Sequence, residues 1–219
     1  MIFAQERPLF DWEWVARNWD EILDRTLEHL YLTAVPVMIG FVLSIGLSMV
    51  ALRWRRSYGP ITVMAGVLYT IPSLATFAIL VPVVGLNATN AIIALTSYTL
   101  LILIRNVVAG VNGVPAAIKE AADGMGYTPR GRFWKTEVPL ALPVIIAGVR
   151  IATVTTVGLV TVSAVLGLGG YGFFILRGLN TFFWTQIIVG VVLSVTLATT
   201  LDLGFIGLKR LVTPWEARV

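Results

Sequence analysis

Cysteine is absent from this 219-residue chain, and histidine occurs once, as His29. The chain therefore has no disulfide, no thiolate metal site and no cysteine nucleophile, and one histidine without clustered partners does not predict a metal site. Charged residues are also scarce, at 13%, whereas a soluble domain carries roughly 25%. No nucleophile–base set or metal-ligand set can be assembled from what remains, so an enzyme is not expected.

The charged residues that do occur are clustered, which leaves long stretches without any. No Asp, Glu, Lys or Arg occurs in residues 30–52, 57–104, 151–176 and 178–201. A helix needs roughly 20 apolar residues to cross a hydrocarbon core about 30 Å thick. The sequence therefore predicts an all-α polytopic membrane protein with about five transmembrane helices.

Turn formers at residues 85–90 divide the longest stretch, 57–104, into two spans. The predicted spans are Leu30–Leu52, Pro60–Gly85, Ala91–Gly110, Leu140–Val165 and Phe183–Leu208. Pro72 and Pro82 mark the second span as a helix that can kink or break.

Basic residues are distributed unequally between the two sides of these spans. One side receives eleven: Arg53, Arg55, Arg56, Arg105, Lys119, Arg130, Arg132, Lys135, Lys209, Arg210 and Arg218. The other side receives four: Arg7, Arg17, Arg25 and Arg177. The positive-inside tendency makes the first side cytoplasmic. An odd number of spans then places the N-terminus outside and the C-terminus inside.

The chain is expected to consist of three parts. Residues 1–29 form an external N-terminal segment with seven acids, three arginines and three interleaved tryptophans. This segment is either amphipathic and lies in the headgroup layer, which favours tryptophan, or is a solvated helix that caps the bundle. Residues 30–212 form the transmembrane domain, and residues 213–219 a cytoplasmic tail.

The longest predicted cytoplasmic connection, at about 111–139 and called the coupling loop below, has the features of a docking element. Pro115 can start a helix, and residues 116–122 are good helix formers. Gly124 and Gly126 supply permissive backbone for a stop. Small alanines beside a glycine let another surface approach closely, so a cytoplasmic partner is expected here.

The coupling loop resembles the EAA loop of ABC importer permeases. Glu120-Ala121-Ala122 is followed by Gly126 after three residues and by Pro139 after twelve more. The family pattern closes with Ile-x-Leu-Pro, whereas this chain has Thr-Glu-Val-Pro, so two apolar positions depart from it. The resemblance implies the type I importer permease fold and a coupling helix at about 118–128 that sits in a cleft of an ATP-binding subunit. The residues implied in coupling are Glu120, Ala121, Ala122, Gly124, Gly126 and Pro139.

Further motifs extend the resemblance over some 180 residues, in the order found in osmoprotectant permeases. They are TLEHLYL at 26–32, YTIPSLA at 69–75, LIRN at 103–106, GMG at 124–126, LALP at 140–143, GVRIA at 148–152 and the glycine run at 167–172. The chain is thus similar to permeases that import glycine betaine, choline, carnitine and related quaternary amines.

The resemblance also implies the partners and the location of the protein. No Gly-x-x-x-x-Gly-Lys-[Ser/Thr] sequence occurs, so ATP and Mg²⁺ are expected on a separate ATPase and no cofactor on this chain. The expected partners are a second permease subunit, identical or paralogous, two ATP-binding subunits, an external binding protein and membrane lipid, with no nucleic acid. The expected location is the cell inner membrane.

Arg150 and Asp202 lie well inside the fourth and fifth predicted spans, whereas Arg105 lies near the cytoplasmic end of the third. Charged groups within a membrane are costly unless they are paired or hydrated. Counting 1.5 Å per residue places Arg150 and Asp202 in the cytoplasmic half at similar depth. Asp202 is therefore predicted to pair with Arg150 or Arg105, and the pair either fixes helix packing or takes part in gating.

Several residues are candidates for the translocation path. Tyrosine rings attract quaternary ammonium ions through cation–π contact, but aromatic packing or anchoring at the membrane interface is the more usual role of such residues. Residues 167–172 satisfy Gly-x-Gly-x-x-Gly but follow a membrane helix rather than a strand, so a turn or short re-entrant element is expected instead of a dinucleotide site. The candidates are Tyr69, Pro72, Ser73, Tyr98, Gly169, Gly170 and Tyr171.

Two other functions stay open at this point. The first is an ABC permease for another small solute, such as methionine or ergothioneine. The second is an ion-coupled secondary transporter, a class that usually shows internal repeats and midplane carboxylates. The sequence shows no such repeat and one intramembrane acid, Asp202.

Overall fold

The computed structural model describes residues 9–215, and this part of the chain is a bundle of helices without a β-strand. The first half contains α1 (Trp12–Arg17), α2 (Trp19–Arg53), the 3-10 turn η1 (Arg55–Ser57), α3 (Tyr58–Thr70), α4 (Ser73–Val84) and α5 (Ala88–Asn112). The second half contains α6 (Ala116–Gly124), α7 (Pro129–Arg132), the π-helical turn η2 (Phe133–Glu137), α8 (Val138–Val162), the 3-10 turn η3 (Ser163–Leu166), α9 (Tyr171–Thr181) and α10 (Trp184–Val212).

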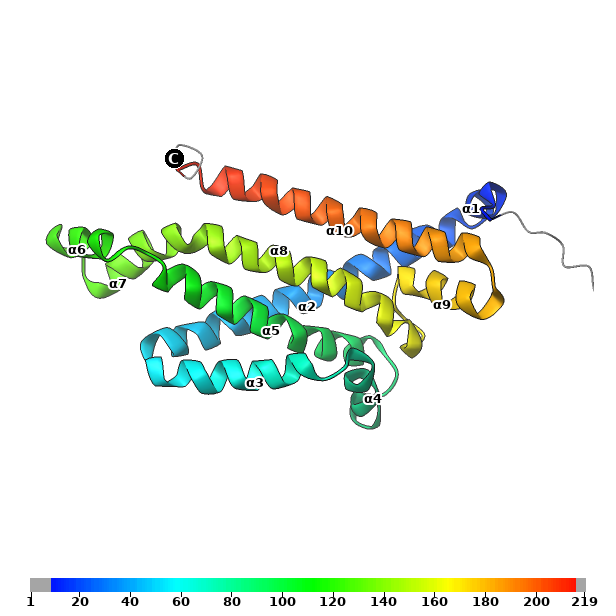
Figure 1. The fold of residues 1–219 in the computed structure, drawn as a ribbon, viewed down its shortest axis with the longest axis horizontal. Helices are drawn as coiled ribbons and strands as arrows, with labels where there is room; N and C mark the ends of the chain where they lie inside the picture. Colours follow the sequence, from blue (N-terminus) through cyan, green and yellow to red (C-terminus); the bar gives the residue numbers. More distant parts are fainter. Residues whose placement is uncertain (1–8, 216–219) are drawn as a thin grey trace, which may run out of the picture.

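The long helices run lengthwise and alternate in direction (Figure 1). α1, α4 and α9 gather at one end of the bundle, and α6, α7 and the C-terminal end of α10 at the other. The second group, together with the α2–α3 turn, carries most of the basic residues and is called the basic end below. Four helical stretches are long and apolar enough to cross a membrane: Trp19–Arg53, Ala88–Asn112, Pro129–Leu166 and Trp184–Val212.

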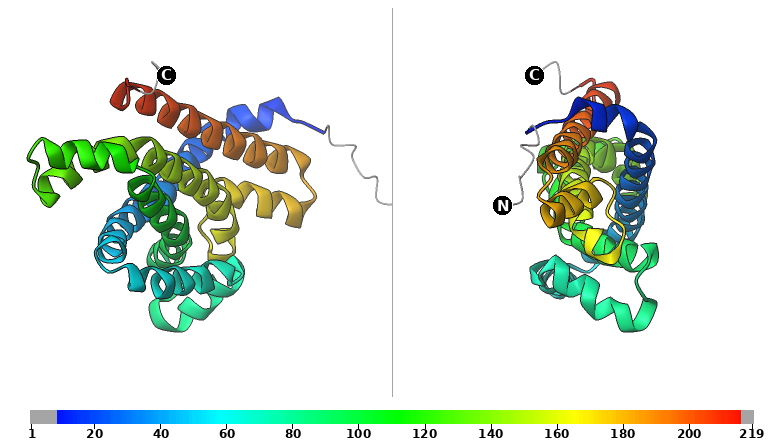
Figure 2. Two further views of the ribbon diagram at one scale, coloured as in Figure 1. Left: turned by 60° about the vertical axis from the view of Figure 1, so that its left-hand side comes forward. Right: turned by 90° about the vertical axis from the view of Figure 1, so that its right-hand side faces the viewer.

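The second predicted span, Pro60–Gly85, is a broken helix rather than a continuous one. α3 and α4 meet at a bend of 95°, and α4 projects from the side of the bundle opposite α10 (Figure 2). Pro72 lies two residues after the last residue of α3 and cannot donate a backbone hydrogen bond, so the helix stops before it. Counted as one span, this pair gives the five spans that the charge distribution predicts.

The first predicted span is part of a longer helix. α2 begins at Trp19 and continues without interruption to Arg53, so no break marks the expected boundary after residue 29. Its 35 residues correspond to about 50 Å at 1.5 Å per residue. The acid-rich N-terminal part of α2 therefore extends the first span as a rigid rod, while α1 forms a separate short turn before it.

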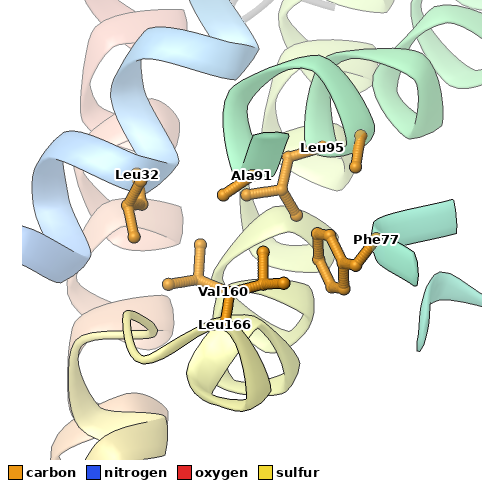
Figure 3. Close-up of a cluster of buried hydrophobic side chains, with 7 residues drawn as sticks. Leu32, Phe77, Ala91, Leu95, Val160 and Leu166 are labelled. Carbon is orange, nitrogen blue, oxygen red and sulfur yellow. The ribbon is translucent and has the colours of Figure 1, made fainter. Parts of the chain in front are cut away.

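The core lies where α2, α4, α5 and the end of α8 meet (Figure 3). Its buried side chains are Leu32, Phe77, Ala91, Ala94, Leu95, Val160 and Leu166. α5 is the central helix, with 61% of its most apolar window buried, against 11% for α10. α10 therefore leaves most of its apolar surface for contact with lipid or another chain.

Candidate coupling site and membrane-embedded residues

The coupling loop begins with α6, which ends in a hydrogen-bonded C-terminal turn. The amide of Gly126 donates to the carbonyl of Asp123 at 2.9 Å, and the amide of Tyr127 donates to the carbonyl of Ala122 at 3.1 Å. These two bonds form a Schellman motif, which requires a left-handed residue at its centre. Gly126 is that residue, with φ of +83°. The predicted helix at 118–128 thus lies at 116–124, because Gly126 terminates it.

α6 presents one side to the chain and the other outward. Ala122 is 1% exposed, whereas Glu120, Ala121 and Gly124 are exposed. Ile118 and Met125, at 37% and 73% exposure, lie four residues before and three after Ala122, and so at the exposed edge of its face. A Cβ added at Gly124 would meet no atom within 4 Å. The outward side of α6 therefore consists mainly of small residues, with Glu120 as a carboxylate, and it is free for a partner.

Glu137 holds the rest of the coupling loop together, a role that the sequence did not predict. Its carboxylate accepts a hydrogen bond from Arg132 Nε at 2.8 Å and lies 3.8 Å from Lys119 Nζ. Arg132 also pairs with Asp123 on α6. The Glu137 side chain is 9% exposed. This ion-pair network fixes α6 against η2 and the start of α8.

The π-helical turn explains why the sequence did not reveal this network. Arg132 and Glu137 are five residues apart, a spacing that does not bring side chains together on an α-helix. In a π-helix the hydrogen bonds span five residues, so this spacing becomes a contact. Pro139 cannot donate to the carbonyl of Lys135 and its ring crowds that carbonyl, so the wider turn forms directly before it.

Arg150 on α8 and Asp202 on α10 form a two-bonded ion pair. Arg150 Nε donates to Oδ1 at 2.9 Å and Arg150 Nη2 to Oδ2 at 2.8 Å. The side chains are 28% and 31% exposed and line a cavity of about 530 Å³ with Thr155 and Thr199. Of the two predicted partners of Asp202, the structure places Arg150 against it. Arg105 is exposed and forms no ion pair within residues 9–215.

Replacing Asp202 alone should destabilise the protein more than replacing the whole pair. Asp202→Ala leaves Arg150 without a counter-charge between two membrane helices, whereas Arg150→Met with Asp202→Leu removes both charges and keeps side-chain volume. We expect Asp202→Ala to lower the melting temperature of the detergent-solubilised protein by several degrees, and the double variant to recover most of that loss. Equal melting temperatures for wild type and Asp202→Ala would mean that the pair does not fix the packing of α8 on α10.

Tyr98 supports the break between α3 and α4. Its hydroxyl donates to the carbonyl of Ile71 at 2.6 Å and lies 2.7 Å from Thr76 Oγ1. Tyr98 is 4% exposed, whereas Tyr69, whose ring meets it edge-on at 6.0 Å, is 38% exposed. Among the candidate path residues of this region, Tyr69 and Pro72 thus have open surface, Ser73 is half-buried and Tyr98 is a buried support.

The glycine run packs inside the chain from Gly169 onward. Tyr171 is 3% exposed, its hydroxyl donates to Thr26 Oγ1 at 3.0 Å, and its amide donates to His29 Nδ1 at 3.2 Å. Gly169 and Gly170 are also buried, with φ of +100° and +50°. A Cβ at Gly170 would lie 2.5 Å from that of His29. That these residues lie beside the translocation path stays a prediction. In the structure they pack closely between helices.

His29 is the second residue whose role the sequence did not predict. It is fully buried, and its Nε2 lies 3.1 Å from the carbonyl of Val157 on α8. Because a carbonyl only accepts and the Tyr171 amide only donates, Nε2 carries the proton and Nδ1 is the acceptor. A single side chain thereby joins α2, α8 and α9. Within residues 9–215, no three His, Asp or Glu side chains come together as a metal site.

Comparison with known proteins gives a family match over most of the chain. Residues 37–216 match the family described as binding-protein-dependent transport system inner membrane component. The chain is 34% identical over 202 residues to the choline transport system permease protein OpuBB of Bacillus subtilis, with 92% of this chain and 93% of the relative covered. It is 32% identical over 194 residues to the osmoprotectant import permease protein OsmW of Salmonella typhimurium, covering 86% and 90%.

Solved structures show the same fold. A chain of the inward-facing MetNI methionine ABC transporter superposes with a TM-score of 0.77 at 23% identity, over 88% of this chain and 96% of that one. A chain of an amino acid ABC transporter with histidines gives 0.75 at 16% identity, over 95% and 99%. The all-α permease architecture predicted from the sequence is therefore confirmed.

Proposed function

Because this chain belongs to the family of binding-protein-dependent transport system inner membrane components, and so is a transport subunit rather than an enzyme, we propose that it forms part of the path for a quaternary-ammonium osmoprotectant. Choline, glycine betaine and carnitine are the solutes of this class. The observation that carries the proposal is the identity of 32–34% to relatives named for choline and osmoprotectant transport, over roughly nine-tenths of each chain.

ATP hydrolysis on a partner subunit drives this transport. That ATPase subunit docks on the outward face of α6. Glu120, Ala121 and Gly124 would contact the ATPase, and Gly126 would set the direction in which the chain leaves it. The network around Glu137 supports this role, because it joins α6 rigidly to η2 and α8. A displacement of α6 would therefore pass directly to a membrane helix. ATP and Mg²⁺ would be bound by the ATPase, and no residue of this chain is assigned to them.

The basic end would face the cytoplasm, with the N-terminus outside. An external binding protein would then deliver the solute at the end formed by α1, α4 and α9. The positive-inside tendency supports this orientation.

A second permease subunit would cover the groove between α8 and α10. The Arg150–Asp202 pair remains about 30% exposed in a single chain, and ionised groups at membrane depth face protein or water rather than lipid. The other helices of this chain also leave most of the surface of α10 uncovered. The translocation path would lie between the two subunits. Two ATP-binding subunits would match the two permease subunits.

The solute class is tested by ATPase stimulation in the assembled complex. We expect the binding protein loaded with choline, glycine betaine or carnitine to raise the ATPase rate of the reconstituted complex several-fold over the unloaded protein. Methionine should give no stimulation. Stimulation by methionine alone would replace the osmoprotectant proposal with the methionine alternative, for which the present support is similarity of fold.

A further inference from the structure

A polar cavity of about 650 Å³ lies at the basic end, between the α2–α3 turn and the coupling loop. The proposed transport function makes no use of it. Its polar lining residues are Arg55, Tyr58, Asn112, Lys119, Arg132 and Glu137. They come from six separate elements, so the cavity exists only because the coupling loop folds back beside the first and third spans.

The cavity carries more positive charge than the chain itself neutralises. Arg132 and Lys119 share the carboxylate of Glu137. Arg132 Nε lies 2.8 Å from it and Lys119 Nζ lies 3.8 Å from it. Arg55 is exposed and forms no ion pair within residues 9–215. Arg132 also pairs with Asp123, which lies outside the lining. Three cations thus meet two carboxylates, and the excess positive charge suits the lining to an anion.

Exposed tryptophans place the cavity at the depth of lipid headgroups. Trp54, directly before Arg55, is 60% exposed, and Trp134, in the η2 turn, is 56% exposed. Tryptophan favours the interface between hydrocarbon and water. Basic pockets between transmembrane helices on the cytoplasmic side bind anionic lipid headgroups, and the proposed orientation puts this cavity on that side.

We propose that this cavity binds the phosphate headgroup of an anionic phospholipid, with Arg55 and Lys119 as its charged contacts. The Tyr58 hydroxyl and the Asn112 amide supply further hydrogen-bond donors in the lining. A bound headgroup would link the end of the first span to the coupling loop. The lipid would in this way stabilise the position of α6 from the membrane side, opposite the face assigned to the ATPase.

The test measures lipid binding to the complete, delipidated complex by native mass spectrometry, with phosphatidylglycerol as the probe. Arg55→Gln removes this cation without breaking an ion pair among the described residues 9–215. We expect it to weaken the most tightly bound phosphatidylglycerol about fivefold, the effect of one cation beside an anionic lipid. Arg56→Gln is the matched control, because Arg56 is an exposed neighbour outside the lining, and it should leave that affinity unchanged. Phosphatidylcholine should not bind tightly to either variant or to wild type.

Several results would overturn the proposal. Equal loss in Arg55→Gln and Arg56→Gln, or no loss in either, would mean that lipid responds to the general charge of this end. Displacement of the lipid by millimolar inorganic phosphate would make free phosphate the ligand. Release of the ATPase subunit by Arg55→Gln with lipid binding unchanged would assign the cavity to that protein. The readout is lipid occupancy, so it stands apart from which solute is transported.

Discussion

Replacing Gly172 with alanine should destabilise the folded chain by about 3 kcal/mol or more, the upper range for overpacking a close contact. A Cβ at Gly172 would lie 2.6 Å from the carbonyl carbon and Cα of Thr161, and closer still to the carbonyl oxygen. These are backbone atoms of α8, so no side-chain rotation can relieve the clash. α9 would have to move away from α8, which would also disturb the contact of Tyr171 with His29. Thermal unfolding of the solubilised protein measures the effect.

Gly158→Ala is the matched control for this substitution. Gly158 also lies in a helix, α8, but a Cβ there would meet no atom within 4 Å. Because alanine favours a helix over glycine by about 1 kcal/mol, the variant should be as stable as wild type or slightly more so. If Gly172→Ala unfolded at the same temperature as Gly158→Ala, the described packing of α9 on α8 would be wrong.

Replacing Gly126 with valine should abolish most binding-protein-stimulated ATPase activity. We expect a loss of at least about tenfold, which corresponds to weakening the contact with the ATPase by more than about 1.4 kcal/mol. Gly126 has φ of +83° and open space around its Cα, so backbone conformation alone dictates glycine there. A β-branched residue at this φ is strained by about 1–3 kcal/mol. The Schellman motif would open and Tyr127 would leave its place after α6. ATPase assays on the assembled complex in nanodiscs measure the loss.

Gly126→Asn separates backbone strain from contact with the partner. Asparagine tolerates the left-handed region, so this variant should keep most of the stimulated activity. Gly124→Ala adds a methyl where the chain itself leaves space, so any loss there reports the approach of the ATPase. Equal loss in Gly126→Val and Gly126→Asn, with assembly retained, would show that side-chain size rather than φ matters at Gly126.

The sequence predicted the long helices well because charge-free length is a direct consequence of bilayer thickness. The predicted span Ala91–Gly110 lies within α5, and α8 and α10 begin within two residues of the predicted Leu140 and Phe183. The fixed rise of a helix gives depth by counting, and it made Arg150 one of the two predicted partners of Asp202. These features depend on local composition and regular geometry alone.

Other features depend on contacts between distant residues and could not be predicted. α9 is short and contains Arg177, so it lacks the length of a span. The sequence predicted only a turn or short re-entrant element at residues 167–172, where α9 begins. Pro72 indicated a break, but the 95° angle accompanies the bond from Tyr98 to Ile71. The ion pairs of Glu137 could not be predicted because a π-helical turn changes which residues are neighbours. The burial of Tyr98 and Tyr171 likewise depends on elements far away in the sequence.

The most direct test of the account is solute uptake by proteoliposomes that contain the complete complex and its binding protein. Labelled choline or glycine betaine should accumulate only when ATP is present on the side of the ATPase subunits. Gly126→Val should abolish this uptake while the subunits stay assembled. Uptake without ATP, driven by an ion gradient and unchanged in Gly126→Val, would contradict the account and favour a secondary transporter.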